Sequence, residues 1–130
     1  MTVRGYAAKY NQLSHPLPAG NRAKFRECIA PGAFDRILRT NPDVVCTFNH
    51  DVNAVLGRTT AGTLLLKADS RGLAFESDLP NATAGRDTYE SVKRGDLNGC
   101  SFAFNLGVNS TRKTLRTRKN SAFADASSAL

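Results

Sequence analysis

The sequence predicts a single, mainly β domain with two short helices, an α+β fold built on a mostly antiparallel sheet that could close into a barrel. Short stretches of alternating apolar and polar residues recur along the chain, and turn signals separate them at intervals of about 8–12 residues. No Gly-rich phosphate-binding motif follows any of these stretches, which argues against a doubly wound nucleotide-binding fold.

Seven strands are expected, each bounded by residues that favour turns. They span residues 3–10, 24–29, 43–50, 55–60, 64–68, 73–79 and 100–106. A loop with two prolines and a glycine, 11–21, separates the first two strands, and a turn at 61–62 separates the fourth from the fifth. The third strand has an almost continuous apolar centre, which is typical of the middle of a sheet. The sixth strand alternates, with Leu73, Phe75, Ser77 and Leu79 on one face.

Two short helices are expected between the strands. Pro31 suits the first turn of a helix that must end before Pro42. Its apolar residues follow at helical spacing and are Phe34, Ile37 and Leu38. The second helix covers residues 83–94, and Gly95 directly after it can form the C-terminal cap.

The composition is that of a globular domain that can bury a core. The chain has 130 residues, of which 41% are hydrophobic and 22% charged, and this length suits one domain. No apolar run approaches the ~18 residues that cross a bilayer. The first six residues lack the apolar segment of a signal peptide. We therefore expect neither a membrane-spanning nor a secreted protein.

The net charge of +7 is concentrated towards the C-terminus. Five of the 18 lysines and arginines lie within residues 112–119, whereas residues 1–110 carry 13 cations and 10 anions. We expect a folded domain over residues 1–108 and a basic, flexible or divergent tail over 109–130. Such a tail can bind nucleic acid or an acidic surface, and is as often simply solvated.

The cysteines give no sign of a metal or disulfide framework. Cys28, Cys46 and Cys100 are far apart and form no CxxC pair. All three occur in apolar, strand-like stretches, so we expect small buried hydrophobic residues in a reducing cytosol. No metal or organic cofactor is indicated.

Each of the two histidines has a structural and a functional interpretation. His15 lies in the proline-containing loop, where an exposed structural role is favoured. His50 closes the third predicted strand between Asn49 and Asp51, and a strand end can present a side chain to a cleft. An imidazole titrates near pH 6.5 and can therefore take and return a proton at neutral pH. The alternative for His50 is a hydrogen bond into a turn.

Ser101 lies in the opposite phase from its apolar neighbours Cys100, Phe102 and Phe104. It is either a small residue that lets another strand approach or a nucleophile that His50 activates for acyl transfer. Cys100 is a rival nucleophile, although its phase matches the core. Neither residue lies in a GxSxG motif, so an α/β-hydrolase is not indicated.

Eight short motifs in order make the chain similar to the prohead serine proteases of tailed bacteriophages. They lie at residues 5–8, 25–34, 49–51, 56–59, 62–64, 71–73, 79–80 and 94–102, so that the resemblance covers residues 3–106. It implies an antiparallel barrel related to the herpesvirus assembly proteases. Residues of the family's catalytic pair map onto His50, the general base, and Ser101, the nucleophile.

The same resemblance implies a capsid-maturation endopeptidase of a phage or prophage. Its partners would be the major capsid protein, whose scaffolding segment it cuts, and the protease itself, by self-cleavage. The herpesvirus relatives form dimers, so self-association is an expected property as well. The implied location is the cytoplasm of the bacterial host, inside the procapsid. A membrane partner is not expected.

Two departures from the family pattern bear on the site. Cys100 stands where the family commonly has Met, and the family's acidic stretch after the serine strand is missing, since no Glu follows Glu90. We therefore expect the fold to lack its C-terminal part. The residue that orients His50 stays open among four acidic residues, Asp51, Glu76, Asp78 and Asp125.

Two other functions compete with the protease. The first is a catalytically impaired or non-catalytic capsid-assembly protein of the same fold, whose basic tail contacts an acidic scaffold. The second is a small basic nucleic-acid-binding β domain. It is the weakest, because Phe102 and Phe104 share a face with apolar neighbours and resemble core more than a stacking platform.

Overall fold

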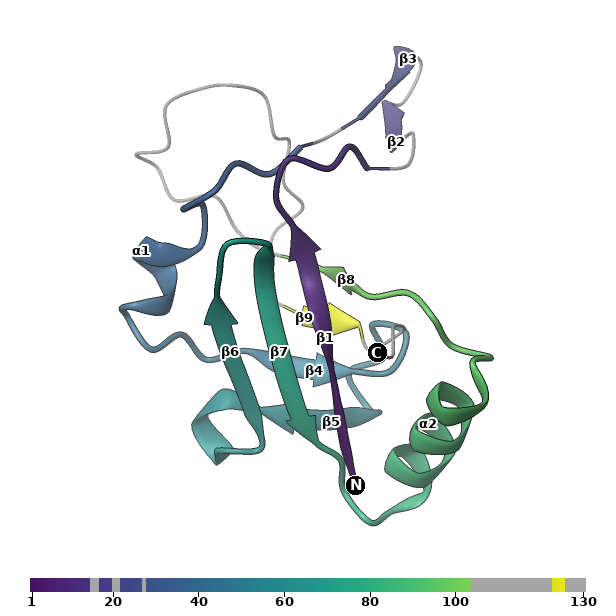
Figure 1. Cartoon of the computed structure of the whole chain (residues 1–130). Helices are drawn as coiled ribbons and strands as arrows, with labels where there is room; N and C mark the ends of the chain where they lie inside the picture. The colour runs from purple at the N-terminus through teal and green to yellow at the C-terminus, as the bar shows by residue number, and fades with distance from the viewer. Residues whose placement is uncertain (15–16, 20–21, 27, 104–122, 126–130) are drawn as a thin grey trace.

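A computed structural model describes residues 1–14, 17–19, 22–26, 28–103 and 123–125, and its elements confirm the mainly β, α+β class (Figure 1). The strands are β1 Thr2–Lys9, β2 Leu17–Ala19, β3 Arg22–Phe25, β4 Val45–Thr47, β5 Val55–Arg58, β6 Leu64–Ala68, β7 Gly72–Asp78, β8 Ser101–Phe102 and β9 Phe123–Asp125. The helices are α1 Asp35–Leu38, α2 Thr83–Arg94 and the 3₁₀ turn η1 Thr59–Ala61.

The first sheet has the strand order β1-β7-β6, and all its pairs are antiparallel. The predicted alternation in β7 is confirmed, because Leu73, Phe75, Ser77 and the following Leu79 are all buried. At the start of β7 the chain passes so close to β1 that a Cβ at Gly72 would collide with the carbonyl oxygen of Ala8. Only glycine fits there.

The second sheet has the order β5-β4-β9-β8. Strand β4 lies inside this sheet, as its apolar centre predicts. It pairs in antiparallel fashion with β5 and in parallel fashion with β9, which brings residues of the C-terminal stretch beside the middle of the chain. Although β5 and β6 follow each other in sequence, η1 and Gly62, with φ +71°, turn the chain between them so that they join different sheets.

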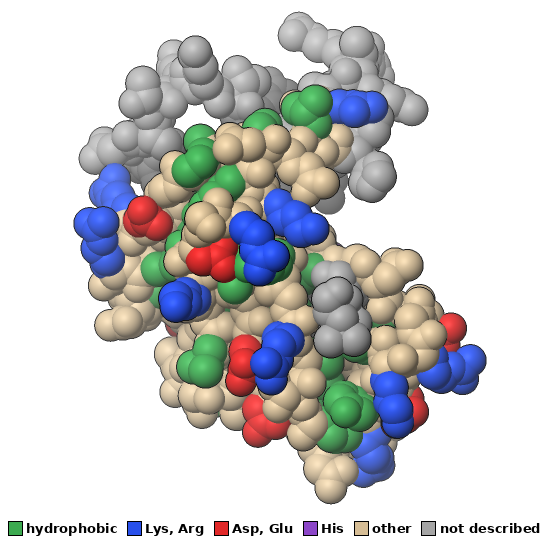
Figure 2. All heavy atoms as spheres, in the orientation of Figure 1, with side chains coloured by type: hydrophobic (Ala, Val, Ile, Leu, Met, Phe, Trp, Pro, Cys, Tyr) green, Lys and Arg blue, Asp and Glu red, His purple; other side chains and the backbone are tan. Residues whose placement is uncertain are grey.

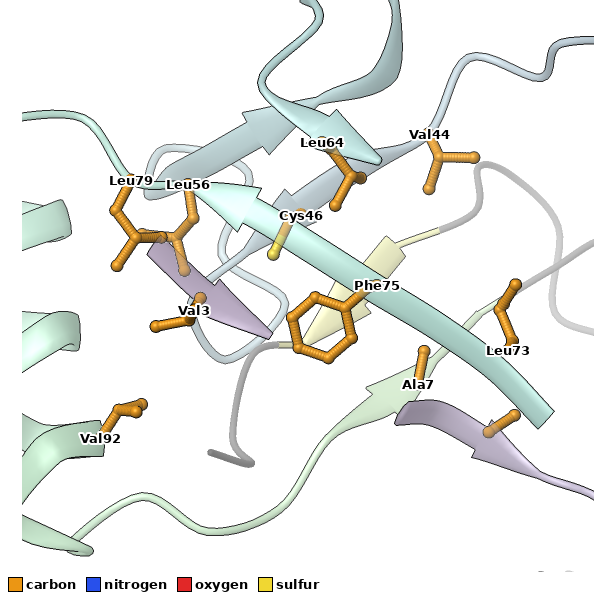
Figure 3. Packing of buried hydrophobic residues seen from close by; sticks show 11 residues of the cluster. Val3, Ala7, Val44, Cys46, Leu56, Leu64, Leu73, Phe75, Leu79 and Val92 are labelled. Carbon is orange, nitrogen blue, oxygen red and sulfur yellow. The ribbon is translucent and has the colours of Figure 1, made fainter. Parts of the chain in front are cut away.

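The main core lies between the two sheets and is closed at one end by α2. Figure 3 shows its side chains, including Val3 and Phe75 from the first sheet, Cys46 and Leu56 from the second, and Val92 from α2. The buried Ser77 hydroxyl is satisfied within this core, because it donates a hydrogen bond of 3.2 Å to the Leu56 carbonyl. The bond links β7 of one sheet to β5 of the other.

Helix α2 confirms the sequence prediction to the residue, whereas α1 does not reach the length expected. Helix α2 covers Thr83–Arg94 and ends on Gly95 in the left-handed conformation, φ +81°. Helix α1 is a single turn, in which Ile37 is 51% exposed instead of buried. Phe34 and Leu38 do pack against the core. Positive φ at Asn41 ends the helical path just before Pro42.

Three further expectations are wrong. The loop at 11–21 contains strand β2, which pairs with β3. The second strand ends at Phe25, and Ile29 makes only an isolated bridge to Tyr10. Cys28 is exposed because it lies outside any strand, while Cys46 is buried as predicted and Cys100 is half-buried.

The described strands form three separate sheets and do not close into the predicted barrel. His15, residues 104–106 and most of the basic tail lie outside the described residues, and the boundary near residue 108 stays a prediction. In the part of the chain that the structure describes, no helix is long and apolar enough to cross a membrane.

Candidate active site

His50 lies in a tight turn three residues beyond the end of β4. The Asp51 amide donates a hydrogen bond of 2.9 Å to the Phe48 carbonyl, and the two residues between them both have positive φ, +49° for Asn49 and +57° for His50. Two successive left-handed residues within such a bond are the pattern of a type I′ turn. Asparagine and histidine adopt this conformation more often than most residues, but it still costs any residue with a Cβ some free energy, so local strain coincides with a candidate functional residue.

The rest of the loop holds this turn in place. The Ala54 amide donates to the Asp51 carbonyl at 3.0 Å, and the Phe48 amide donates to the Ala54 carbonyl at 3.0 Å. One carboxylate oxygen of Asp51 accepts bonds from the backbone and side chain of Asn53, at 2.9 and 3.1 Å. Backbone hydrogen bonds at both ends therefore restrict how far the His50 backbone can move.

Ser101 begins the edge strand β8, whose orientation is set by an aromatic contact. The next residue, Phe102, is half-buried against the core, and its ring meets the Phe34 ring edge-on with centroids 5.5 Å apart. Because neighbouring residues of a strand point to opposite faces, Ser101 points outward and is exposed. The opposite phases of these two residues were predicted from the sequence.

The fold brings the two predicted residues into direct contact although 51 positions separate them. Nε2 of His50 lies 2.7 Å from Oγ of Ser101. In the tautomer with its proton on Nδ1, the imidazole accepts this bond from the hydroxyl. The distance falls within the ~2.6–3.2 Å typical of a nucleophile and its general base. Both side chains are exposed, so a substrate can reach the pair.

The four acidic residues considered for a third role occupy different places. Glu76 and Asp78 lie on β7 of the other sheet, where Glu76 is 3.8 Å from Arg4 and Asp78 is 3.4 Å from the terminal amino group. Asp51 binds Asn53 within the turn. Asp125 lies on β9, where its backbone is in register with Ser101 on one side and with Thr47 on the other.

Cys100 and the potential metal ligands are the remaining features of this site. Cys100 packs against the core, in agreement with its phase. Within the described residues, no group of three His, Cys, Asp or Glu side chains could hold a metal ion.

Comparison with known proteins identifies the family of the chain. The model of the caudovirus prohead serine protease family matches residues 1–124, a span that includes both His50 and Ser101. No curated protein and no solved structure matches the chain. The resemblance seen in the sequence motifs is confirmed by the family match. Because that match covers nearly the whole sequence, the chain belongs to the caudovirus prohead serine protease family.

Proposed function

We propose that this chain is a serine endopeptidase of capsid maturation, with Ser101 as nucleophile and His50 as general base. Family membership supports the reaction class. The observation that carries the assignment of residues is the 2.7 Å contact between the His50 imidazole and the Ser101 hydroxyl. Their exposure on an open face suits a polypeptide substrate, which a closed pocket would exclude.

The chemistry that follows from this pair is acyl transfer in two halves. His50 Nε2 takes the hydroxyl proton while Ser101 Oγ attacks the scissile carbonyl carbon, and a tetrahedral oxyanion forms. The protonated imidazole then gives its proton to the leaving amine, and the C–N bond breaks to leave an ester on Ser101. In the second half, His50 takes a proton from a water molecule that attacks the ester carbon. The ester C–O bond then breaks, the proton returns to Ser101 Oγ, and the carboxylic acid product leaves. Backbone N–H groups are the donors that would stabilise the oxyanion.

Asp125 is our candidate for the residue that orients His50. The support is its register, because the backbone of Asp125 on β9 is paired with that of Ser101 on β8. Asp51 is the less suitable candidate because its carboxylate already organises the turn.

The substrate we propose is the major capsid protein, cut in its scaffolding segment, together with the protease itself. Cleavage would take place inside the procapsid, in the cytoplasm of the bacterial host. Family membership supports a role with phage capsid proteins. Self-association and a fold related to that of the herpesvirus assembly proteases belong to the same proposal.

The test is co-expression with the major capsid protein encoded beside this chain. We expect wild type to shorten the capsid protein and Ser101→Ala and His50→Ala to lose this processing by about 10⁴-fold or more. Ser91→Ala on α2 is the matched control and should cut normally. A fluorophosphonate probe should label wild type and fail to label Ser101→Ala. A folded wild type that leaves the capsid protein uncut and takes no label would favour the non-catalytic assembly protein instead.

A further inference from the structure

The outer face of the β1-β7-β6 sheet forms an open groove rich in positive charge. We call it the basic groove; its charged lining residues are Arg4, Lys9, Lys67, Arg71 and Glu76. Figure 2 looks onto this face and shows Lys and Arg side chains on it, with acidic ones among them. The groove has a volume of about 1320 Å³.

Strand alternation, together with the β-bulge between Tyr6 and Ala8 that shifts its phase in β1, explains how the side chains from the strands come to share one face. The register pairs Arg4 of β1 with Glu76 of β7, and Lys67 of β6 with Ala74 of β7. Their neighbours in sequence, such as Val3 and Phe75, point inward to the core. The groove and the core are therefore the two faces of the same sheet.

The charges of the groove are only partly neutralised within the protein. Arg4 is 3.8 Å from Glu76, a long and exposed pair. Lys9 and Lys67, both exposed, have no ion pair with any described residue. Even with the nearby Asp69 counted, four cations face two carboxylates. This imbalance on a concave surface attracts an acidic ligand.

The shape and the apolar parts of the groove favour a polypeptide ligand. Its volume exceeds the ~300–1,000 Å³ of small-molecule pockets, and Leu65, which also lines it, is 61% exposed. The Arg71 guanidinium lies 4.8 Å from the centre of the Tyr6 ring. The Tyr6 hydroxyl donates a 2.6 Å bond to Asp69. The Tyr6 ring is thus already covered, which removes the aromatic platform that single-stranded nucleic acid would need.

The groove also extends to the segment that carries the candidate nucleophile. Asn98 lines it and precedes Ser101 by three residues. Three residues of extended chain span at most about 11 Å. The groove therefore reaches the segment that leads into Ser101.

We propose that the basic groove binds an acidic segment of the polypeptide substrate next to the site of cleavage. The identity of this ligand as a substrate rests on the proposed protease function. Binding of an acidic peptide to this face does not, so the two can fail separately.

The binding test uses the full chain with Ser101→Ala, which prevents self-cleavage. The probe is a fluorescein-labelled peptide of about ten residues, the length that the strands can accommodate, rich in Asp and Glu with Leu and Tyr between them. Its control carries Asn and Gln in their place. We expect the acidic peptide to bind and the neutral one not to bind. Lys9→Glu with Lys67→Glu should weaken binding by about tenfold or more.

A matched control separates the groove from net charge. Arg36→Glu with Arg39→Glu makes the same charge change at two exposed residues outside the groove lining, one in α1 and one directly after it, and should alter the affinity by less than about twofold. Equal weakening by both double variants, or equal binding of the neutral peptide, would overturn the proposal. Tighter binding of a single-stranded oligonucleotide, lost on Lys9→Glu with Lys67→Glu, would overturn it in favour of nucleic acid.

Cleavage kinetics then separate the groove from the protease function. With active wild type, the lysine variant should raise KM for the capsid protein and leave kcat unchanged. Wild type that binds the acidic peptide but cuts nothing contradicts the protease and leaves the groove standing. Wild type that cuts with unchanged KM in the lysine variant contradicts the groove alone.

Discussion

The left-handed conformation of His50 should lower the stability of the fold, and glycine at this position should reveal the cost. A left-handed backbone costs an L-residue about 1–2 kcal/mol, which glycine avoids. A glycine variant loses about 0.4–1 kcal/mol of folding stability, because glycine gives the unfolded chain greater conformational freedom. His50→Gly and His50→Ala both remove the imidazole and its bond to Ser101, so this loss cancels between them. The glycine variant should therefore be more stable than the alanine variant by about 0.5–1 kcal/mol.

Urea unfolding followed by circular dichroism measures this difference. With a urea dependence of about 1–3 kcal/mol per molar, the midpoint of His50→Gly should lie roughly 0.2–1 M above that of His50→Ala. Neither variant should process the capsid protein, because both lack the general base.

Asn53 provides the control within the same loop. Its φ is not positive, so the order should reverse, with Asn53→Ala more stable than Asn53→Gly. Both of these variants lose the same side-chain bond to Asp51. A His50→Ala protein at least as stable as His50→Gly would refute the idea that the turn stores strain at this histidine.

Three further predictions follow from the geometry. Asp125→Asn should lower kcat by about 10²–10⁴-fold in the capsid-processing assay, whereas Asp51→Asn should change it far less; equal effects would contradict the assignment. Gly57→Ala should lower the free energy of unfolding by about 2 kcal/mol or more, because a Cβ there would overlap the Ser77 hydroxyl of β7 and the carbonyl oxygen of Thr63; a urea midpoint equal to that of wild type would contradict this. The Arg58 guanidinium lowers the pKa of Asp43, so the pair stabilises the fold at neutral pH and this contribution is lost as the pH falls below about 4. The free energy of unfolding of Asp43→Asn should accordingly vary less with pH than that of wild type across the acid range, as thermal unfolding at several pH values would show.

The elements that the sequence predicts well are those with local signals. Helix α2 combines helical spacing with a glycine in the position where only a left-handed residue closes the last turn. Strand β7 shows its alternation because one of its faces is buried along its whole length. In both cases the determinants lie within the element itself, so sequence pattern is sufficient.

The elements that the sequence mispredicts depend on distant partners. The spacing in α1 suggests a buried face, yet the helix is one turn long and leaves Ile37 in solvent. Strand β9 has no alternation of its own and is defined by pairing with β4, 78 positions earlier in the chain for the Cys46–Ala124 pair. Long-range pairing of this kind leaves no local pattern to read.

The candidate site also combines features that local sequence predicts with features that depend on distant residues. The phase of Ser101 was readable from Phe102, but its contact with His50 came from the family motifs and not from spacing. The sequence placed His50 at the end of a strand, whereas it occupies a turn with two positive φ values. Asparagine at position 49 is a signal for such a turn, although a histidine after it conceals the pattern because Asn-Gly is the common pair.

Energetics argue that the His50–Ser101 contact is kept for a reason other than stability. A hydrogen bond between two exposed side chains contributes about 0.5–1.5 kcal/mol at most, because water competes for both groups. The left-handed backbone of His50 costs a similar amount, so the net gain to the fold is close to zero. Ser101→Ala removes only the hydrogen bond and should change the free energy of unfolding by less than about 1.5 kcal/mol while it abolishes cleavage. A large loss of stability in that variant would indicate a structural role for the contact.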